Sequence, residues 1–137
     1  MKNNKFEGFT LVELIIVMVL LGILAAVAVP KMGNTISSSE EATEDAIIAA
    51  LQSAVEMYAM DQVVNNSVKS YPSNPFDELD KPPSGYSGVG SLGDIDGEWV
   101  FNNDSQDTYV AHRRNDNNKY KWDYNDTDGT FGDRVAY

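Results

Sequence analysis

The sequence predicts an α+β protein in which a long N-terminal helix packs against a small antiparallel sheet of three to four strands. The helix is predicted by an apolar run near the N-terminus and by an apolar stripe at helical spacing that continues it. The sheet is predicted by short aromatic segments between turns rich in Asn, Asp and Gly. We divide the chain into a polar start (1–8), an apolar helix (9–30), an amphipathic continuation (31–64), a loop region (65–98) and an antiparallel meander (99–137).

Composition limits the classes of function. The 137 residues carry a net charge of −11, which disfavours nucleic acid as a partner because phosphates would be repelled. The chain has no cysteine, so disulfides, thiolate metal sites and a cysteine nucleophile are excluded. The residues after Pro30 suffice for one small core, and packing against the helix must supply the stability that disulfides give many exported domains.

The apolar run extends from Phe9 to Val29, and its only polar side chains belong to Thr10 and Glu13. As a helix it spans about 32 Å, enough to cross a bilayer core. A carboxylate near the middle of a membrane helix costs about 2.5–3.5 kcal/mol on insertion scales. Glu13 therefore predicts a functional role and a charged partner.

The charges flanking this run predict its orientation. Lys2 and Lys5 precede it and an acidic cluster at 40–45 follows, so the N-terminus is expected in the cytoplasm and the bulk of the chain outside. An ordinary signal peptide is the alternative, with cleavage after Ala28 releasing a soluble secreted binding domain that begins at Val29. The length of the run and the acid at its start weigh against that alternative.

The segment Gly8-Phe9-Thr10-Leu11-Val12-Glu13-Leu14, followed by Gly22 and Pro30, resembles the N-terminus of type IV pilins and type II secretion pseudopilins. The resemblance covers about the first thirty residues. It implies that residues 1–8 are a prepilin leader, that prepilin peptidase cleaves after Gly8, and that Phe9 becomes the N-methylated first residue. It also implies that the helix anchors the subunit in the inner membrane until assembly.

Further partners follow from this resemblance. The family implies a homo-oligomeric helical filament with related pilins, an inner-membrane assembly platform, and the lipid bilayer before assembly. The C-terminal domain is expected outside the cytoplasm, in a pilus at the cell surface or in a periplasmic pseudopilus. Pilus and secretion pseudopilus share the motif and both readings stay open. The missing C-terminal disulfide favours a pseudopilin or an atypical pilin.

Simple electrostatics explains an acid at position 13. Cleavage leaves an ammonium on Phe9, and pairing it with Glu13 of an adjacent copy neutralises both charges inside an apolar filament core and fixes the axial register. Gly22 and Pro30 are weak points of the helix, because proline lacks a backbone donor and clashes one turn back. We therefore expect helix flexibility at these two positions.

The amphipathic continuation shows an apolar stripe at Ile47, Leu51, Ala54 and Tyr58. We expect this stripe to be covered by the sheet, and the acids at 40, 41, 44, 45 and 56 to occupy other faces. The helix is expected to end at Asn65-Asn66-Ser67. In the meander, we expect strands around Trp99–Phe101, Thr108–His112 and Tyr120–Tyr124, with turns between them.

Three groups of residues bear on chemistry. Alternating acids before a glycine, at Asp94 and Asp96 and again at Asp126 and Asp128, resemble short calcium loops, but neither continues into an EF-hand. Calcium is thus a secondary prediction and no other cofactor is predicted. His112 is the only histidine and no nucleophile–base spacing is visible, so we predict no enzyme. A basic patch is expected from Arg113, Arg114, Lys119 and Lys121, facing acidic surfaces of neighbouring subunits or, as the less favoured alternative, DNA.

Overall fold

The structure of the protein is a computed structural model that describes residues 8–137, apart from the side chains of Lys31 and Asn34. Of the predicted leader, only Gly8 lies among the described residues. The elements in chain order are helix α1 (Leu11–Asn66), the short 3-10 helix η1 (Pro75–Glu78), and strands β1 (Tyr86–Val89), β2 (Trp99–Asn103), β3 (Thr108–Arg113), β4 (Lys119–Asn125), β5 (Thr130–Phe131) and β6 (Val135–Ala136). The predicted α+β class is confirmed.

The chain forms two compact units, one ending at Ser39 and the other comprising Glu40–Tyr137. The described part of the first unit is the apolar part of α1, which passes through Gly22 and Pro30 without interruption. Its most apolar 18-residue window has a mean hydropathy of 3.0, and none of that window is buried. By length and composition, this helix can cross a membrane.

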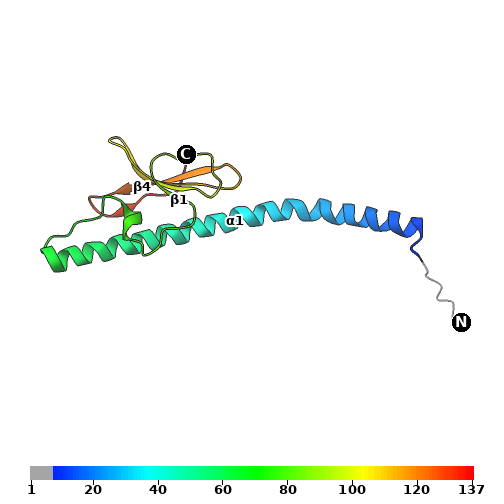
Figure 1. Ribbon diagram of the computed structural model, residues 1–137, viewed down its shortest axis with the longest axis horizontal. Helices are drawn as coiled ribbons and strands as arrows, with labels where there is room; N and C mark the ends of the chain where they lie inside the picture. Colours follow the sequence, from blue (N-terminus) through cyan, green and yellow to red (C-terminus); the bar gives the residue numbers. More distant parts are fainter. Residues whose placement is uncertain (1–7) are drawn as a thin grey trace. The chain divides into compact units, whose positions relative to one another are not determined.

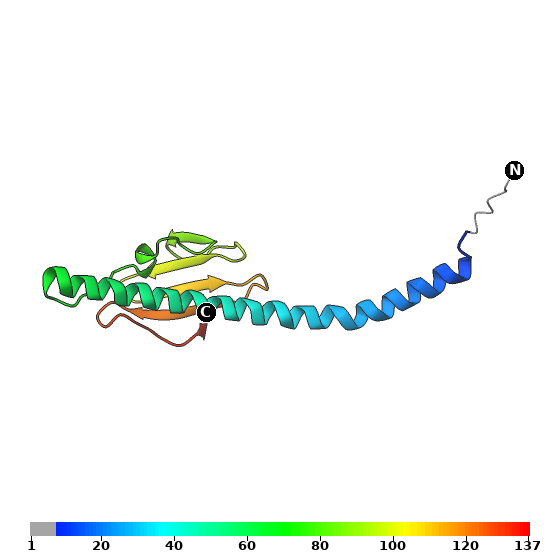
Figure 2. The same ribbon diagram turned by 90° about the horizontal axis from the view of Figure 1, so that it is seen from below.

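In the second unit, α1 continues from Glu40 to Asn66 and lies along one face of the sheet (Figures 1 and 2). Ser67 adopts a left-handed conformation with φ 56°, and its backbone N–H donates to the carbonyl of Val63 at 3.0 Å. A left-handed residue directly after the last helical one is a common helix stop. The predicted helix end at Asn65–Ser67 is confirmed.

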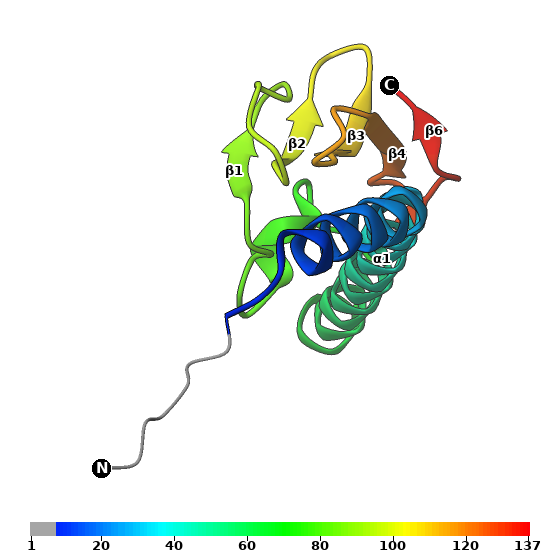
Figure 3. The same cartoon turned by 90° about the vertical axis from the view of Figure 1, so that its right-hand side faces the viewer.

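The sheet is larger than the sequence predicts. Strands β2, β3 and β4 form the expected antiparallel meander, in which Phe101 pairs with Val110 and Val110 with Trp122. Strand β1 adds a parallel neighbour to β2, whereas β5 and β6 both pair with β4 (Figure 3). The sheet is therefore mixed and not purely antiparallel as predicted, because β1 runs parallel to β2. Strand β1 comes from the stretch that sequence analysis assigned to loops.

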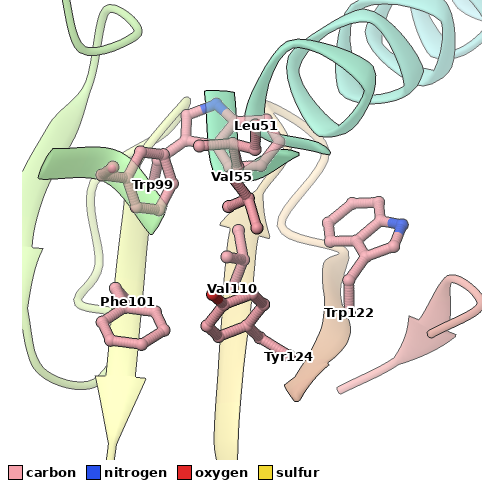
Figure 4. Close-up of a cluster of buried hydrophobic side chains, with 8 residues drawn as sticks. Leu51, Val55, Trp99, Phe101, Val110, Trp122 and Tyr124 are labelled. Carbon is pink, nitrogen blue, oxygen red and sulfur yellow. The ribbon is translucent and has the colours of Figure 1, made fainter. Parts of the chain in front are cut away.

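Alternation along the strands divides the core into two layers. Trp99 and Phe101 of β2 point toward α1 and pack with Leu51 and Val55 (Figure 4). The same cluster contains Val110, Trp122 and Tyr124 from β3 and β4, together with Phe76 of η1. On the opposite face, Val100 packs with Tyr109, Ala111 and Leu92. The predicted covering of the apolar helix stripe by the sheet is confirmed at Ile47 and Leu51.

One glycine makes a close approach between the helix and the C-terminal turn. Gly129 has φ +72°, and a Cβ there would lie 2.3 Å from the Tyr71 ring and 3.0 Å from Val55. We expect Gly129→Ala to lower the free energy of unfolding by about 1–3 kcal/mol, because strain and overpacking add. Urea unfolding of the full chain in detergent measures the change.

Gly132→Ala is the matched control. A Cβ at Gly132 would meet only Asp123 atoms at 3.7 Å, an ordinary contact. We expect the control to stay near wild type. Equal destabilisation by the two substitutions would contradict the close approach at Gly129.

Candidate functional site

The predicted assembly residue Glu13 caps the start of its own helix. Because α1 begins at Leu11, Thr10 is the N-cap and Glu13 the third helical residue. The Glu13 carboxylate accepts from the Thr10 backbone N–H at 2.8 Å and from the Thr10 hydroxyl at 2.9 Å. In return, the Glu13 N–H donates to Thr10 Oγ1 at 3.2 Å. These contacts form a capping box, and the sequence signal for it is the Thr-x-x-Glu spacing.

The surroundings of Glu13 are open and apolar. Phe9 is 94 % exposed, and with Glu13, Leu14 and Val17 it lines a surface hollow of about 290 Å³. A cap supplies neutral donors but leaves the carboxylate charge uncompensated. The predicted pairing of Glu13 with Phe9 of another copy therefore stays a prediction, as does flexibility at Gly22 and Pro30.

A buried carboxylate joins α1 to the sheet in the second unit. Glu44 is fully buried, and Arg114 holds it with two hydrogen bonds, from Nε at 2.8 Å and from Nη2 at 2.6 Å. His112 Nδ1 lies 2.8 Å from Glu44 Oε1, and Arg134 Nε lies 3.1 Å from Oε2. We call Glu44, His112, Arg114 and Arg134 the buried ion network. The prediction that Glu44 occupies a face away from the core is wrong.

Strand geometry explains which residues reach Glu44. Side chains alternate between the faces of a strand, so His112 faces the helix with Val110, and Arg114 follows on the same side. Aromatic rings contact two of the groups that reach Glu44: His112 stacks on Trp99 at 4.3 Å between centroids, and Arg114 lies 4.1 Å from the Tyr120 ring centre. These contacts help to orient the side chains of His112 and Arg114 toward Glu44.

Neighbouring acids on the first turns of this helical segment extend the contact. Arg134 bonds Glu41 Oε1 at 2.6 Å and also pairs with Asp45. The Asn115 backbone N–H donates to Glu40 Oε1 at 2.9 Å. The acidic cluster at 40–45 is therefore a docking element for the C-terminal strands of its own chain. Sequence analysis gave Arg134 no role.

Opposing influences set the pKa of Glu44. Burial raises it, but hydrogen bonds and positive charge from Arg114 and His112 outweigh burial and hold the pKa below its usual value. The Glu44 carboxylate likewise raises the pKa of Arg114 above its usual value. Glu44 and Arg114 are thus ionised together at neutral pH.

Three of the four residues of the predicted basic patch share one face of the sheet. Arg113 and Lys119 are partners across β3 and β4, and Lys121 follows on the same side, whereas Arg114 faces the helix. Arg113 points to the sheet face opposite Arg114, where it bonds the Gly93 carbonyl at 2.9 Å and Asp94 at 2.7 Å. Lys121 pairs with Asp123 at 3.2 Å. Acids of the same chain thus pair with Arg113 and Lys121, and contact of this face with acidic neighbours or DNA stays a prediction.

The calcium candidates take up other contacts. Arg113 faces both Asp94 and Asp96, at 2.7 and 3.7 Å, and holds the pKa of Asp94 below its usual value. Asp128 accepts from the backbone N–H and the hydroxyl of Thr130 at 3.1 and 2.6 Å. Within residues 8–137, no group of three or more His, Cys, Asp or Glu side chains is placed to hold a metal. Calcium binding at Asp126 or elsewhere stays an untested prediction.

Comparisons with known proteins agree with this architecture. Residues 3–29 match the prokaryotic N-terminal methylation motif. The chain is 37 % identical over 111 residues to the type IV narrow pilus major component PilA5 of Thermus thermophilus, covering 80 % of this chain and 89 % of that protein. It is 33 % identical over 87 residues to the type II secretion system core protein G of Pseudomonas aeruginosa, covering 62 % and 57 %. The type IV wide pilus major component PilA4 of Thermus thermophilus is 41 % identical over 70 residues, covering 51 % and 50 %.

The chain thus spans about half the length of core protein G and PilA4, but nearly all of PilA5. No solved structure gives a significant match. A methylation motif on a long apolar helix that carries a small sheet defines a pilin-like protein. The chain belongs to the family of type IV pilins and type II secretion pseudopilins.

Removing the buried charge tests the ion network. We expect Glu44→Gln to lower the free energy of unfolding by about 3 kcal/mol or more, because it leaves buried cations without a counter-charge. Glu56→Gln is the control: Glu56 pairs with Lys69 at 3.7 Å in an exposed position, so its loss should cost under about 0.5 kcal/mol. Denaturant unfolding compares both, and equal small losses would contradict the network.

Acid should weaken the same contact. Because the folded-state pKa of Glu44 is lowered, its contribution is complete above the ordinary value of about 4.5 and is lost as pH falls through the lower folded-state pKa. We therefore expect the stability difference between wild type and Glu44→Gln to shrink below about pH 4.5. Unfolding curves at several pH values measure it, and a difference that does not change with pH would contradict the assignment.

Proposed function

We propose that this chain is a structural subunit of a type IV pilus or pilus-like filament. The observation that carries the proposal is the match to PilA5, a pilus major component, over nearly the whole length of that relative. The exposed apolar part of α1 supports it, because a monomer with this surface needs lipid or other subunits around it. Before assembly, the bilayer holds residues 9–30 in the inner membrane, with the second unit outside the cytoplasm.

Processing prepares the N-terminus for assembly. Prepilin peptidase cleaves after Gly8 and leaves a free amine on Phe9, which then receives a methyl group from a methyl donor. Among the described residues, nothing lies within 4 Å of the position that a Gly8 Cβ would take, and Phe9 precedes the helix in an open position, so a peptidase can reach this bond. The match of residues 3–29 to the methylation motif supports this step.

Assembly then gives Glu13 its counter-charge. In the single chain, Thr10 satisfies the hydrogen bonds of the carboxylate without neutralising it. In an apolar filament core, that charge becomes costly unless a cation approaches. The Phe9 ammonium of an adjacent copy supplies one, and the pair fixes the register between subunits. The assembly platform extracts the subunit from the membrane. The role proposed for the chain itself is structural and not catalytic.

A secretion pseudopilin is the second candidate. Matches to core protein G from several bacteria favour it, although they cover only about half of each relative. The two candidates differ in the machinery that assembles the subunit. Complementation separates the two candidates. In a strain that lacks its major pilin, restored surface filaments would identify a pilin. In a strain that lacks core protein G, restored protein secretion would identify a pseudopilin.

The mature N-terminus tests the processing step. Mass spectrometry of the assembled subunit should find a chain that starts at Phe9 and carries one added methyl group. A chain that starts at Val29 would instead show ordinary signal-peptide cleavage and would overturn the proposal.

Two variants separate the charge of Glu13 from its cap. Glu13→Gln keeps an acceptor for Thr10 but removes the charge, and we expect at least a tenfold loss of filaments by electron microscopy and shear yield. Thr10→Val removes the hydroxyl and keeps the charge, so only a mild loss is expected, equivalent to a lost cap of about 1 kcal/mol. Normal filament yield from Glu13→Gln would contradict the charge pairing.

A further inference from the structure

Three Asn-x-Ser/Thr triplets occur in the second unit, and they differ in local structure. The triplets begin at Asn65, Asn103 and Asn125, and all three asparagines are exposed. Such a triplet is the acceptor for N-linked glycosylation in exported proteins, where the asparagine amide takes the sugar and the hydroxyl two residues later is required as well. The local structure therefore decides which triplet can serve as an acceptor.

The triplet at Asn125 places both required groups on one turn. Asn125 is the last residue of β4, directly before the turn to β5. Its Oδ1 accepts a hydrogen bond from the Thr127 backbone N–H at 2.9 Å, so the amide and the threonine lie close together. Among the described residues, none bonds Nδ2 of Asn125 or the hydroxyl of Thr127. Both groups are thus accessible to an enzyme.

The other two triplets lack this arrangement. In the turn from β2 to β3, the amide that accepts a backbone N–H is that of Asn102, which bonds Asp104 at 2.9 Å. The Ser105 hydroxyl of the triplet at Asn103 is already engaged, because it donates to the Asp104 carboxylate at 3.2 Å. Asn65 lies in the last turn of α1, where the backbone is helical. Of the three triplets, the one between β4 and β5 alone combines an unbonded hydroxyl with a non-helical backbone.

A glycan on Asn125 displaces nothing from the core. The preceding residue, Tyr124, belongs to the buried core cluster, so strand alternation turns Asn125 to the opposite side. The three residues of the triplet are exposed. At the other end of the turn, the Gly129 carbonyl accepts from the Gln52 side chain at 3.0 Å. The turn is thus anchored to α1 at its glycine and open at its asparagine.

We propose that Asn125 is an acceptor for N-linked glycosylation by a transferase that uses an oligosaccharide carried on a polyprenyl diphosphate. In the transfer, Nδ2 of Asn125 forms a bond to C1 of the first sugar as the bond from C1 to the diphosphate oxygen breaks. The lipid diphosphate leaves with that electron pair, and one amide proton passes to a base of the transferase. The reaction involves no oxidation or reduction.

The proposed function supplies the meeting place of donor and acceptor, and the inference rests on it in this respect. A subunit whose apolar helix lies in the inner membrane presents its second unit on the outer side of that bilayer. The polyprenyl chain holds the oligosaccharide donor in the same bilayer. Donor and acceptor then meet by diffusion in the plane of one membrane.

Mass spectrometry of the chain purified from the cells that encode it tests the proposal. Trypsin cuts after Lys121 and Arg134, so Asn125 lies in the peptide 122–134, apart from the other two triplets. We expect this peptide to carry sugar residues that fragmentation places on Asn125, and we expect Asn65 and Asn103 to carry none. An unmodified peptide 122–134, or equal occupancy of all three asparagines, would overturn the inference.

Variants separate the triplet from general exposure. Asn125→Gln and Thr127→Val should each lower the glycosylated fraction of the peptide at least tenfold, whereas Thr127→Ser keeps the hydroxyl and should retain the glycan. Asn103→Gln is the matched control, because it removes another exposed asparagine and should leave that fraction unchanged. A glycan that persists on Asn125 in Thr127→Val would contradict the proposal.

The same spectra distinguish this inference from the proposed function. A chain that starts at methylated Phe9 and carries an unmodified Asn125 overturns the inference alone. A glycosylated Asn125 on a chain that starts at Val29 supports the inference, since export by either route exposes the turn, and overturns the proposed function.

Discussion

The contact between Glu44 and its cations is the interaction on which the second unit depends. Glu44 is fully buried, so its charge is tolerated only because Arg114, Arg134 and His112 surround it at 2.6–3.1 Å. Removing any one of these groups leaves the others in a poorly solvated site. The network thus specifies how the helix sits on the sheet, while the apolar cluster around Leu51 and Val55 supplies most of the favourable burial.

Glu44 and Glu13 differ in how the charge of the carboxylate is compensated. Glu44 finds its counter-charges, Arg114 and Arg134, within its own chain. Glu13 finds only neutral donors from Thr10, and its charge remains open to a partner. This contrast is consistent with the proposed function, in which the counter-charge of Glu13 comes from an adjacent copy.

Patterns of neighbouring residues predicted the long helix and the three central strands. The helix, its end at Asn66, and the strands around Phe101, Val110 and Trp122 all follow from periodicity and turn residues. Strand β1 escaped prediction because Gly88 interrupts it and its pairing with β2 depends on the tertiary fold. Strands β5 and β6 are only two residues each, too short for any alternation to show.

The candidate site residues were likewise predictable only where the sequence carried a local signal. Phe9 and Glu13 were found through a motif, and the Thr10 cap had a visible spacing. Glu44 was misplaced because it sits among other acids, although its spacing to Ile48 and Leu51 already puts it on the core side of the helix. No local pattern could reveal that Arg134 would join it from 90 residues away.

The long sequence separations within the buried ion network have a consequence for biogenesis. Glu44 meets Arg114 across 70 residues, and the neighbouring exposed Glu41 meets Arg134 across 93. During synthesis and export the helix emerges first, and its acids stay hydrated and unpaired until almost the whole chain has followed. The contact between the helix and the sheet of the second unit is therefore a late and non-local event in folding.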